Sequence, residues 1–393
     1  MSRLSKSVTA NVLAITLLNV FRGLAESGFR AFFSSYMGRL GYSLGEIGTV
    51  ATLSNIVGAL VSPAVGYLLE VYSSRLITAL TGLISAASLT ILALSRDVAS
   101  LTLSYALFSL AMYFAQPART VFLARTVEIG RLGTVVGVTT FTFTVSRAIG
   151  PALGGYLVNA YGYSSTFLTL ALVAVAGSTA FLALSHEPEA GRKSQAPSIV
   201  EAYRNAIKPS KNLALTYLFT SIDRAAWNLW NPMLSAYLLE KGYDEVSIGM
   251  LISFSNVVEA ASTPIAGKLT DKLGSSISLA LSELTAAIAA ASLMNPNPQP
   301  IAVLSMASIG LSLGFWVPGY NVYIAKVFKN VGEAFASINA VRSLASVPSP
   351  YLGGVLYGVV SPIAPFATST AMLLVAMGIA ATSLKNVETR IQR

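Results

Sequence analysis

An internal duplication is the feature that most limits how this chain can fold. Residues 41–69 and 242–270 are two copies of one segment, related by a constant offset of 201 residues. Eleven of the 29 aligned positions are identical, namely Gly41/Gly242, Tyr42/Tyr243, Ile47/Ile248, Gly48/Gly249, Ser54/Ser255, Asn55/Asn256, Val57/Val258, Ala59/Ala260, Pro63/Pro264, Gly66/Gly267 and Leu68/Leu269. Composition alone would give far fewer identities, so each half of the chain is predicted to be one structural unit.

Strongly apolar sequence surrounds both copies. Apolar residues make up 54% of the chain and charged residues 11%, whereas about a quarter of the residues of a soluble domain are charged. Apolar stretches of about 20 to 28 residues, long enough to cross a bilayer, lie near 9–37, 44–70, 74–95, 99–125, 132–158, 163–185, 211–239, 245–270, 274–294, 299–327, 333–358 and 363–384. The sequence therefore predicts an all-α membrane protein with twelve transmembrane helices in two six-helix, pseudo-symmetric halves. Repeats of this kind commonly frame a transport path.

The predicted organisation has three parts. An N-terminal six-helix bundle covers 1–185, a cytoplasmic linker covers 186–210, and a C-terminal six-helix bundle covers 211–393. Ser198 and Glu201 form a capping box in the linker, which favours a short amphipathic helix on the membrane surface. A flexible linker is the alternative. The first span is too long for a signal-peptide core and has no cleavage site after it, so we expect it to remain in the mature protein.

The distribution of basic residues predicts the orientation in the membrane. With the N-terminus inside, the cytoplasmic loops and ends carry 17 Lys and Arg residues, and the other side carries only Arg39, Arg96 and Lys241. Because basic loops stay in the cytoplasm, we expect a multi-pass protein of the cell membrane with both termini cytoplasmic. The net charge of +9 is largely this signal, so no nucleic-acid partner is expected. We expect a monomer whose partners are the bilayer, protons and a small-molecule substrate.

Two glycine-containing motifs lie near the ends and inside the spans. One closes the eighth span and reads Gly267-Lys-Leu-Thr-Asp271-Lys272-Leu-Gly274, with a weaker copy from Gly66 to Glu70 at the end of the second span. The other lies in the fifth span and reads Gly150-Pro151-Ala-Leu-Gly154-Gly155, echoed by Pro350-Tyr-Leu-Gly353-Gly354 in the eleventh. The first motif resembles the signature Gly-x-Leu-x-Asp-Arg/Lys-x-Gly of the major facilitator superfamily, and the second is similar to the Gly-Pro-x-x-Gly-Gly motif of antiporters in that superfamily.

The resemblance covers the whole chain, and it implies a secondary transporter of the major facilitator fold. It also implies that the small residues let helices approach closely where the halves slide past each other. One departure is Tyr105, which stands where many drug antiporters of the superfamily carry an arginine early in span 4.

Charges at the cytoplasmic ends of the spans are candidate gates. Arg125 and Lys326 are repeat-related ends of spans 4 and 10. Glu70 with Arg125 and Asp271 with Lys326 are therefore predicted pseudo-symmetric ion pairs that hold the cytoplasmic side closed. Alternatively, these charges only anchor helix ends at the lipid headgroups.

Ten ionisable residues lie inside the predicted spans, where each costs about 2.5–3.5 kcal/mol on insertion scales unless it has a partner or a function. They are the basic residues Arg22, Arg30, Arg119, Arg147, Arg224 and Arg342, and the acidic residues Glu26, Asp223, Glu259 and Glu283. The basic excess slightly favours an anionic or zwitterionic ligand over a lipophilic cation.

Three of these charges share one face of the first span. Arg22, Glu26 and Arg30 are spaced by four residues, so they stack along one side of a helix and are expected to face a central cavity. One interpretation is a ladder that neutralises itself and locks the helix in place. The other is that Glu26 exchanges a proton with the cavity while an arginine is released for substrate.

Glu26, Glu259 and Asp223 are the candidates for proton coupling. Flanking arginines favour the ionised form of Glu26, whereas burial favours its protonated form. Glu259 has no basic neighbour on its own helix, which favours reversible protonation, and Asp223 ranks third because Arg224 is adjacent. Glu283 is expected at the periphery, in packing or in lipid-facing protonation.

The remaining candidates would bind substrate. Arg22 and Arg224 are related by an offset of 202 and could clamp a phosphate or carboxylate. Polar and aromatic residues that could line the cavity are Trp227 and Asn228 in span 7, Tyr113 and Gln116 in span 4, and Trp316 and Tyr320 in span 10. Trp227 replaces Glu26 in the repeat and is expected to face the cavity.

These patterns favour a secondary active transporter over an enzyme. The chain has no cysteine and one histidine, His186, and it has no glycine-rich phosphate loop or metal-ligand cluster, so no cofactor or metal is expected. We expect a proton-coupled exporter of small organic compounds that works by alternating access. The alternatives are an organic-anion or phosphate-ester transporter that uses Arg22 and Arg224, and a non-transporting receptor or lipid-handling protein.

Overall fold

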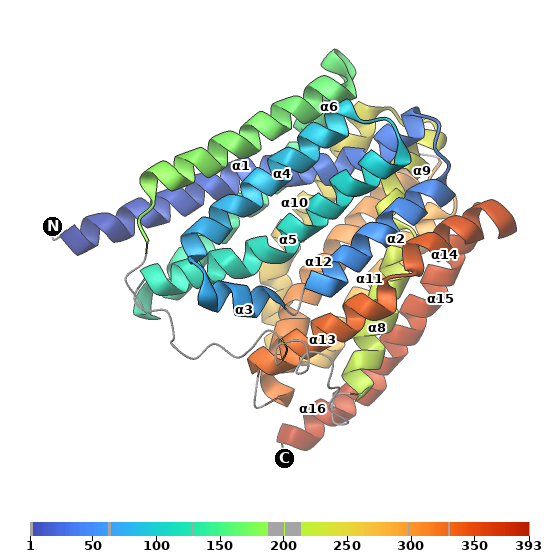
Figure 1. Cartoon of the computed structure of the whole chain (residues 1–393). Coiled ribbons are helices and arrows are strands. Elements are labelled where there is room, and N and C mark those ends of the chain that lie inside the picture. The colour runs from blue at the N-terminus through green and yellow to red at the C-terminus, as the bar shows by residue number, and fades with distance from the viewer. Residues whose placement is uncertain are drawn as a thin grey trace. The chain divides into compact units, whose positions relative to one another are not determined.

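The computed structural model describes residues 3–61, 64–127, 129–187, 200, 214–297, 299–328 and 331–392. Every secondary-structure element in these ranges is a helix (Figure 1). The predicted all-α class is therefore confirmed. The expected surface helix of the linker, with Ser198 and Glu201, lies outside the described residues.

Contacts between residues divide the chain into two units. The first consists of Met1–Phe33 and Leu53–Arg204, and the second of Ser34–Thr52 and Asn205–Arg393. The segment Ser34–Thr52 therefore belongs with the second half of the chain, which the duplication did not indicate.

The first unit contains the helices of the first half. They are α1 (Arg3–Arg39) as far as Phe33, α2 (Leu44–Val61) from Leu53 onward, α3 (Ala64–Val71), α4 (Ser74–Leu94), α5 (Val98–Thr126) and α6 (Ile129–Leu184). Helix α4 packs along both α5 and α6. Phe122 of α5 meets the ring of Phe181 of α6 in a buried apolar cluster, which fixes these helices around α1.

A single glycine divides α6 into two spans. Gly162 has a φ of 79°, in the left-handed region that a residue with a Cβ enters only with strain. The fifth and sixth predicted spans are thus consecutive helices joined by one sharp bend.

The second unit contains the helices of the second half. They are α8 (Ala214–Asn228), η2 (Asn231–Met233), α9 (Leu234–Glu240), α10 (Glu245–Leu273), α11 (Ser275–Leu293), α12 (Gln299–Val327), α13 (Val331–Ser346), α14 (Ser349–Val355), η3 (Leu356–Val360), α15 (Ala364–Ile379), η4 (Ala380–Leu384) and α16 (Lys385–Gln392). Two spans are broken at prolines, which lack the backbone N–H that a helix interior needs. Pro232 lies in η2, and Pro348 and Pro350 lie where α13 gives way to α14.

The prediction of twelve spans is confirmed by these helices. Among the described residues, nine helices are individually long and apolar enough to cross a membrane. One of them, α6, supplies two spans. The broken spans, α8 with α9 and α13 with α14, complete the set.

Turns at equivalent positions explain two of the identities in the repeat. Gly41 follows α1 and Gly242 follows α9, with φ angles of 91° and 90°. After each glycine, the N–H of Tyr42 or Tyr243 returns to a carbonyl of the last helical turn, as in a Schellman cap. The next helix then starts at an equivalent cap, with the Ser43 hydroxyl accepting from the Glu46 N–H in one copy and the Asp244 carboxylate accepting from the Ser247 N–H in the other.

Small residues explain why Ser34–Thr52 packs with the second unit. A methyl group on Gly48 would collide with the carbonyl of Pro350, and one on Gly354 would come 2.6 Å from the Cα of Gly45. Backbones approach this closely only where side chains are absent.

Polar contacts hold the same segment. The hydroxyl of Thr52 accepts a hydrogen bond from the Tyr351 N–H at 2.9 Å. The Arg39 Nε lies 2.7 Å from a carboxylate oxygen of Glu245, the first residue of α10. These contacts were not predicted, because they join residues about 200 or 300 positions apart.

The glycine-proline motif of α6 packs on α1 within the first unit. A methyl group on Gly150 would collide with the hydroxyl of Ser27, and one on Gly154 would come 2.8 Å from the ring of Phe32. Close approach of two helices is therefore one role of the motif. The gating role predicted for Gly150, Pro151, Gly154 and Gly155 stays a prediction.

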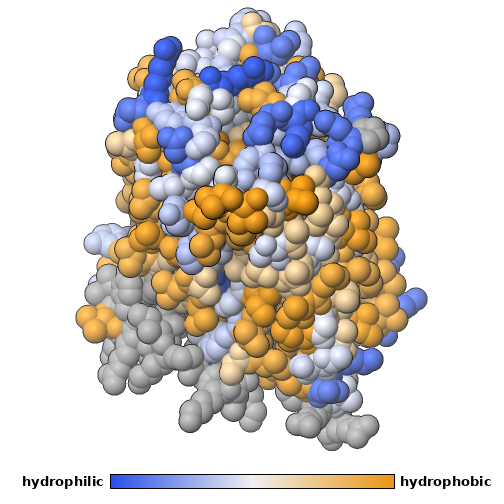
Figure 2. All heavy atoms as spheres, turned by 90° about the vertical axis from the view of Figure 1, so that its right-hand side faces the viewer, coloured by the Kyte–Doolittle hydropathy of each residue, from blue (hydrophilic) through white to orange (hydrophobic). Residues whose placement is uncertain are grey.

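Large hydrophobic side chains cover much of the surface. Figure 2 shows them over the middle of the visible face, with hydrophilic residues gathered at its upper end. Phe141 and Leu172 of α6 are 68% and 69% exposed, and Val359 of η3 is 79% exposed. Such residues suit contact with lipid.

Candidate functional site

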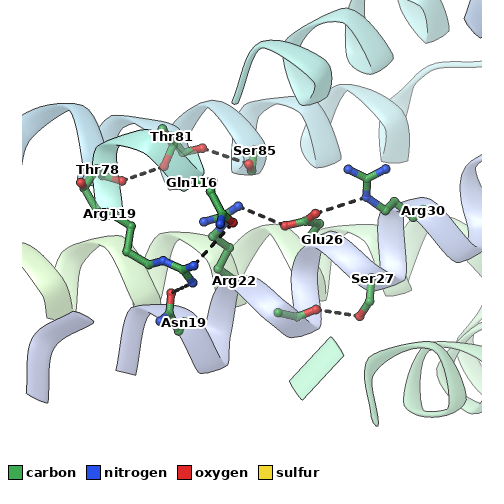
Figure 3. A network of polar contacts seen from close by, with 11 residues as sticks. Asn19, Arg22, Glu26, Ser27, Arg30, Thr78, Thr81, Ser85, Gln116 and Arg119 are labelled. Atoms are coloured by element: carbon green, nitrogen blue, oxygen red, sulfur yellow. Dashed lines mark hydrogen bonds and ion pairs between the residues drawn. The ribbon is translucent and has the colours of Figure 1, made fainter. Parts of the chain in front are cut away.

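The charged ladder of α1 forms as its spacing predicted (Figure 3). Nη2 of Arg22 lies 3.3 Å from one oxygen of Glu26, and Nε of Arg30 lies 3.2 Å from the other. The side chains of Arg22 and Glu26 are 11% and 10% exposed, whereas that of Arg30 is 58% exposed. Glu26 is thus buried in the middle of the ladder, between a buried arginine and one that reaches a more open region.

A second layer of polar groups from α5 extends the ladder. Arg119 is buried, and its guanidinium donates to the side-chain oxygens of Asn19 at 3.4 Å and Gln116 at 3.5 Å. Asn19 is fixed in turn, because its amide donates to the Thr139 carbonyl at 2.8 Å. Figure 3 shows Arg119 and Gln116 turned toward the Arg22 end of the ladder.

The surroundings of Glu26 are strongly cationic. Arg22, Arg30 and Arg147 all act electrostatically on its carboxylate, and Arg119 is also in range. The ring of Phe143 lies 5.2 Å from the guanidinium carbon of Arg22 and 5.8 Å from that of Arg119, so an aromatic face partly compensates two guanidiniums that share one acid. Arg22, Glu26, Arg30, Arg119 and Arg147 are called the first cluster below.

A small cavity adjoins the first cluster. Its lining includes Arg22 and Glu26 of α1 and Gly82 and Ser85 of α4. The absence of a side chain at Gly82 accommodates the hydroxyl of Ser178, with which a methyl group there would collide. The cavity itself is small and lies directly beside the ion pair of Arg22 and Glu26.

The second unit brings together four of the predicted residues. Nη2 of Arg342 on α13 lies 3.3 Å from an oxygen of Asp223 on α8, and both side chains are largely buried. The guanidinium of Arg342 also lies 5.1 Å from the ring centre of Trp316 and 5.8 Å from that of Tyr320 on α12. An arginine held by a carboxylate and two aromatic rings is firmly oriented.

Glu283 corrects a prediction. It was expected at the periphery, but it is 1% exposed on α11, and Asp223 and Arg342 are the charged groups that act on it. Its place on a core-facing side of α11 was hidden because the sequence has no charged residue near it along the chain. Asp223, Glu283, Trp316, Tyr320 and Arg342 are called the second cluster below.

The two clusters occupy equivalent places in the repeat. At the offset of 201, Arg22 corresponds to Asp223, Gly82 to Glu283 and Arg119 to Tyr320. The duplication therefore kept the position of a polar site and exchanged its charges.

Other predicted substrate-binding residues lie in different surroundings. The ring of Trp227 contacts the tilted ring of Trp230, with ring centres 5.1 Å apart, and its neighbour Asn228 is buried. Tyr113 packs with an apolar cluster on α3 and α5, and a methyl group on Gly58 would collide with its ring. The interpretation that fits Tyr113 best is packing between α2 and α5.

Arg224 and Glu259 are the two remaining charged candidates. Arg224 is exposed beside Asp223. Glu259 is part-buried on α10, where its backbone carbonyl accepts hydrogen bonds from the hydroxyls of Ser262 and Thr263.

The structure contradicts one of the two predicted ion pairs at the cytoplasmic ends. The Glu70–Arg125 pair stays a prediction, because the Glu70 side chain lies outside the described residues. Lys326 pairs with Glu388 at 3.0 Å, and Asp271 and Lys272 are exposed. Arg125 donates to the carbonyl of Leu69 at 3.2 Å. The prediction of an Asp271–Lys326 pair is therefore wrong, because α16 brings a closer carboxylate. The surroundings of Gly66 and of the Glu70 side chain lie outside the described residues. A methyl group on Gly267 would meet open space.

The sequence did not lead us to predict a role for Glu388 or for Glu187, its equivalent in the repeat. Glu388 accepts hydrogen bonds from the backbone amides and hydroxyls of Ser275 and Ser276, at the start of α11. In the first unit, Glu187 accepts from the hydroxyl of Ser73, the cap of α4. Glu187 and Glu388 are 201 residues apart, so extending the repeat beyond its best-matched segment would have found them. Each carboxylate ties the end of a half back to the start of its third span.

The whole-chain comparison decides the family. A family model of the major facilitator superfamily matches residues 15–350 and 213–392. The chain belongs to the major facilitator superfamily. Family and fold point to a transporter in a membrane rather than to an enzyme.

Curated relatives carry the names of multidrug resistance proteins, and one of them is named an efflux pump. The chain is 23% identical to the multi-drug resistance efflux pump PmrA of Streptococcus pneumoniae, over 86% of this chain and 87% of the relative. It is 22% identical to multidrug resistance protein 1 of Bacillus subtilis, over 95% of this chain and 96% of the relative.

Solved transporter structures share the fold of this superfamily member. The nucleoside transporter NupG matches with a TM-score of 0.72 and 16% identity, covering 98% of this chain and 99% of that one. A POT family transporter in complex with a thioalcohol-conjugated peptide matches with a TM-score of 0.75 and 12% identity, covering 97% and 96%. Transporters of different substrates thus share this arrangement of helices, and the likeness is to the fold alone.

Proposed function

We propose that this transporter is a proton-coupled antiporter that exports small organic compounds by alternating access. The observation that carries the proposal is the buried position of Glu26 between Arg22 and Arg30, beside a small cavity. The names of the curated relatives as efflux proteins support the direction of transport and the class of substrate.

The chemistry of coupling follows from the charge on Glu26. When Glu26 is ionised, its two oxygens hold Arg22 and Arg30 in the ladder. When it takes up a proton, the attraction is lost and the guanidiniums repel each other. Protonation therefore favours a conformation in which the arginines reach water or a ligand, and a ligand that restores the ladder favours release of the proton.

The test is transport by purified protein in liposomes that contain a trapped pH indicator. The panel of added compounds comprises lipophilic cations, sugars, carboxylates and phosphate esters. Proton movement elicited by one class, lost in Glu26→Gln and kept in Glu46→Gln, is the expected result. Glu46 is a fair control because it is an exposed acid in the cap of α2. Compound flux without proton movement would contradict the proposed coupling.

A second candidate function is transport of organic anions or phosphate esters. The excess of guanidiniums around Glu26 favours it, since arginine binds such groups bidentately. In this case carboxylates or phosphate esters would raise the melting temperature of the purified protein, and Arg22→Gln would abolish the rise. Stabilisation by lipophilic cations instead would favour the exporter.

We also propose that the protein is a monomer of the cell membrane with both termini cytoplasmic. The chain contains no cysteine, so single cysteines introduced at Ser198 and Arg96 report their side of the membrane without background. A membrane-impermeant thiol reagent added to intact cells is expected to label Arg96→Cys and to leave Ser198→Cys unlabelled.

A further inference from the structure

The carboxylate of Glu283 is the most deeply buried acid without a partner in the described residues. Its side chain is 1% exposed, and neither of its oxygens accepts a hydrogen bond. The hydroxyl of Tyr320, in the same cluster, is also buried without a hydrogen bond. A charged carboxylate in such surroundings would cost several kcal/mol, so its protonation state depends on the nearby charges.

The charged groups that act on Glu283 belong to two other helices of the second unit. Asp223 of α8 repels a negative charge on Glu283, and Arg342 of α13 attracts it. Arg224 also acts on Asp223 but is exposed. Helix α15, which packs along α11, carries no charged residue. Glu388 meets the start of α11, about 12 Å along the helix from Glu283 by the helical rise.

The charges do not balance if every group is ionised. The buried cluster has two carboxylates, Asp223 and Glu283, and one guanidinium, Arg342. Arg342 is already hydrogen-bonded to Asp223 and stacked on Trp316. Two like charges that share one counter-charge in a low dielectric hold a proton between them. Because Asp223 has the hydrogen bond and Glu283 has none, Glu283 carries the proton in this arrangement.

We propose that Glu283 and Asp223 form a carboxylate pair that shares Arg342 and one exchangeable proton, which makes the second half a proton-binding site of its own. The proposal rests on the proposed function for its role in transport, but the proton site can be tested without transport. When Glu283 releases its proton, it competes with Asp223 for Arg342. The partner of Arg342, and with it the packing of α13 against α8 and α12, then follows the protonation state.

The first half has no equivalent of this pair. Gly82 stands at the position of Glu283, and Arg22 at that of Asp223. The site is therefore specific to the second half, and Glu26 and Glu283 are separate sites for protons.

The test is infrared spectroscopy of the purified full-length protein, which detects the carbonyl band of a protonated carboxylic acid. At neutral pH, the wild type is expected to show this band and Glu283→Gln to lack it. Glu245→Gln is the matched control, because Glu245 is also a buried acid but is paired with Arg39. Its spectrum is expected to keep the band.

Two further variants test the shared guanidinium. Asp223→Asn frees Arg342 to pair with Glu283, so the band is expected to disappear although Glu283 is intact. Arg342→Gln removes the counter-charge, so the band is expected to grow. A band that survives in Glu283→Gln would overturn the proposal, and so would a band that is unchanged in Asp223→Asn. Because glutamine imitates a protonated glutamate, a Glu283→Gln variant that does not fold would also count against a protonated Glu283.

Flux measurements separate this proposal from the proposed function. If the wild type exchanges protons for compounds and Glu283→Gln does so unchanged, Glu283 is not part of the coupling site and the functional reading of the pair is wrong. If the wild type transports nothing but the infrared results hold, the proton site stands and the proposed function fails.

Discussion

The two polar clusters differ in the balance of their charges. In the first cluster, Glu26 is the one acid, and four arginines act on or beside it. In the second, Asp223 and Glu283 share Arg342, and aromatic rings occupy the rest of the space. Equivalent backbone positions thus hold an anion surrounded by cations in one half and a cation shared by anions in the other. Duplication therefore preserved the position of a buried polar site, whereas the charges at that site diverged.

The largest expected effect is at the centre of the first cluster. Glu26→Gln leaves Arg22 and Arg30 without a counter-charge on α1, and breaking a buried pair costs about 3 kcal/mol or more. Thermal unfolding in detergent should show this loss. The double variant Arg22→Gln with Glu26→Gln should regain most of the stability and none of the proton-coupled flux. Equal instability of the single and double variants would show that the ladder does not act as a charge-balanced unit.

The next largest loss of stability is expected at the end of the second half, at Glu388. Glu388 accepts from two amides, two hydroxyls and Lys326, so Glu388→Gln is expected to lower stability by about 2 kcal/mol. Glu187→Gln, in which an uncharged oxygen accepts the bond from Ser73, should cost less. Guanidinium unfolding of the two variants measures the difference. The same loss in both would mean that the two ends are equally important in spite of their different contacts.

A smaller loss of stability is expected when one arginine of each cluster is replaced by lysine. Arg342→Lys keeps the charge beside Asp223 but loses the flat contact with Trp316 and Tyr320, at a cost of about 1 kcal/mol. Arg119→Lys, in the first cluster, loses hydrogen bonds that are long, at 3.4 and 3.5 Å, and should cost less. Melting temperatures of the two variants test this prediction. A larger loss in Arg119→Lys than in Arg342→Lys would show that hydrogen bonding outweighs the contact with the aromatic rings.

The smallest effect is at a helix cap. Hydrogen bonds from the side chain and backbone of Ser247 hold the pKa of Asp244 below its usual value. The stabilisation is present above the unfolded-state pKa and is lost as the pH falls through the lower folded-state pKa. Asp244→Ala should therefore cost about 0.5 kcal/mol at neutral pH and nothing in strong acid. A cost that is the same at every pH would exclude the carboxylate as the cause.

Local spacing decided which parts of the site could be predicted. The ladder of Arg22, Glu26 and Arg30 needs only the periodicity of one helix, and the twelve spans need only apolar length. The pair of Asp223 with Arg342 joins positions 119 residues apart. Its partners depend on which helices pack together, and neither composition nor spacing contains that information.

The burial of Glu283 could not be predicted from the sequence either. A lone acid in an apolar span looks the same in sequence whether it faces lipid or a buried arginine. Only the packing of α11 against its neighbours distinguishes these cases. By contrast, the pair Glu187 and Glu388 was available from the repeat, and it was missed because the flanking sequence has diverged.

The membership of Ser34–Thr52 in the second unit has a consequence for the continuity of the chain. Helix α1 passes from one unit to the other between Phe33 and Ser34, and α2 returns between Thr52 and Leu53. The segment between these two crossings, Ser34–Thr52, packs within the second unit through glycine backbones and a few polar bonds. The second unit therefore cannot be assembled from the second half of the chain alone, because the contacts of Arg39 with Glu245 and of Thr52 with Tyr351 reach back into the first half.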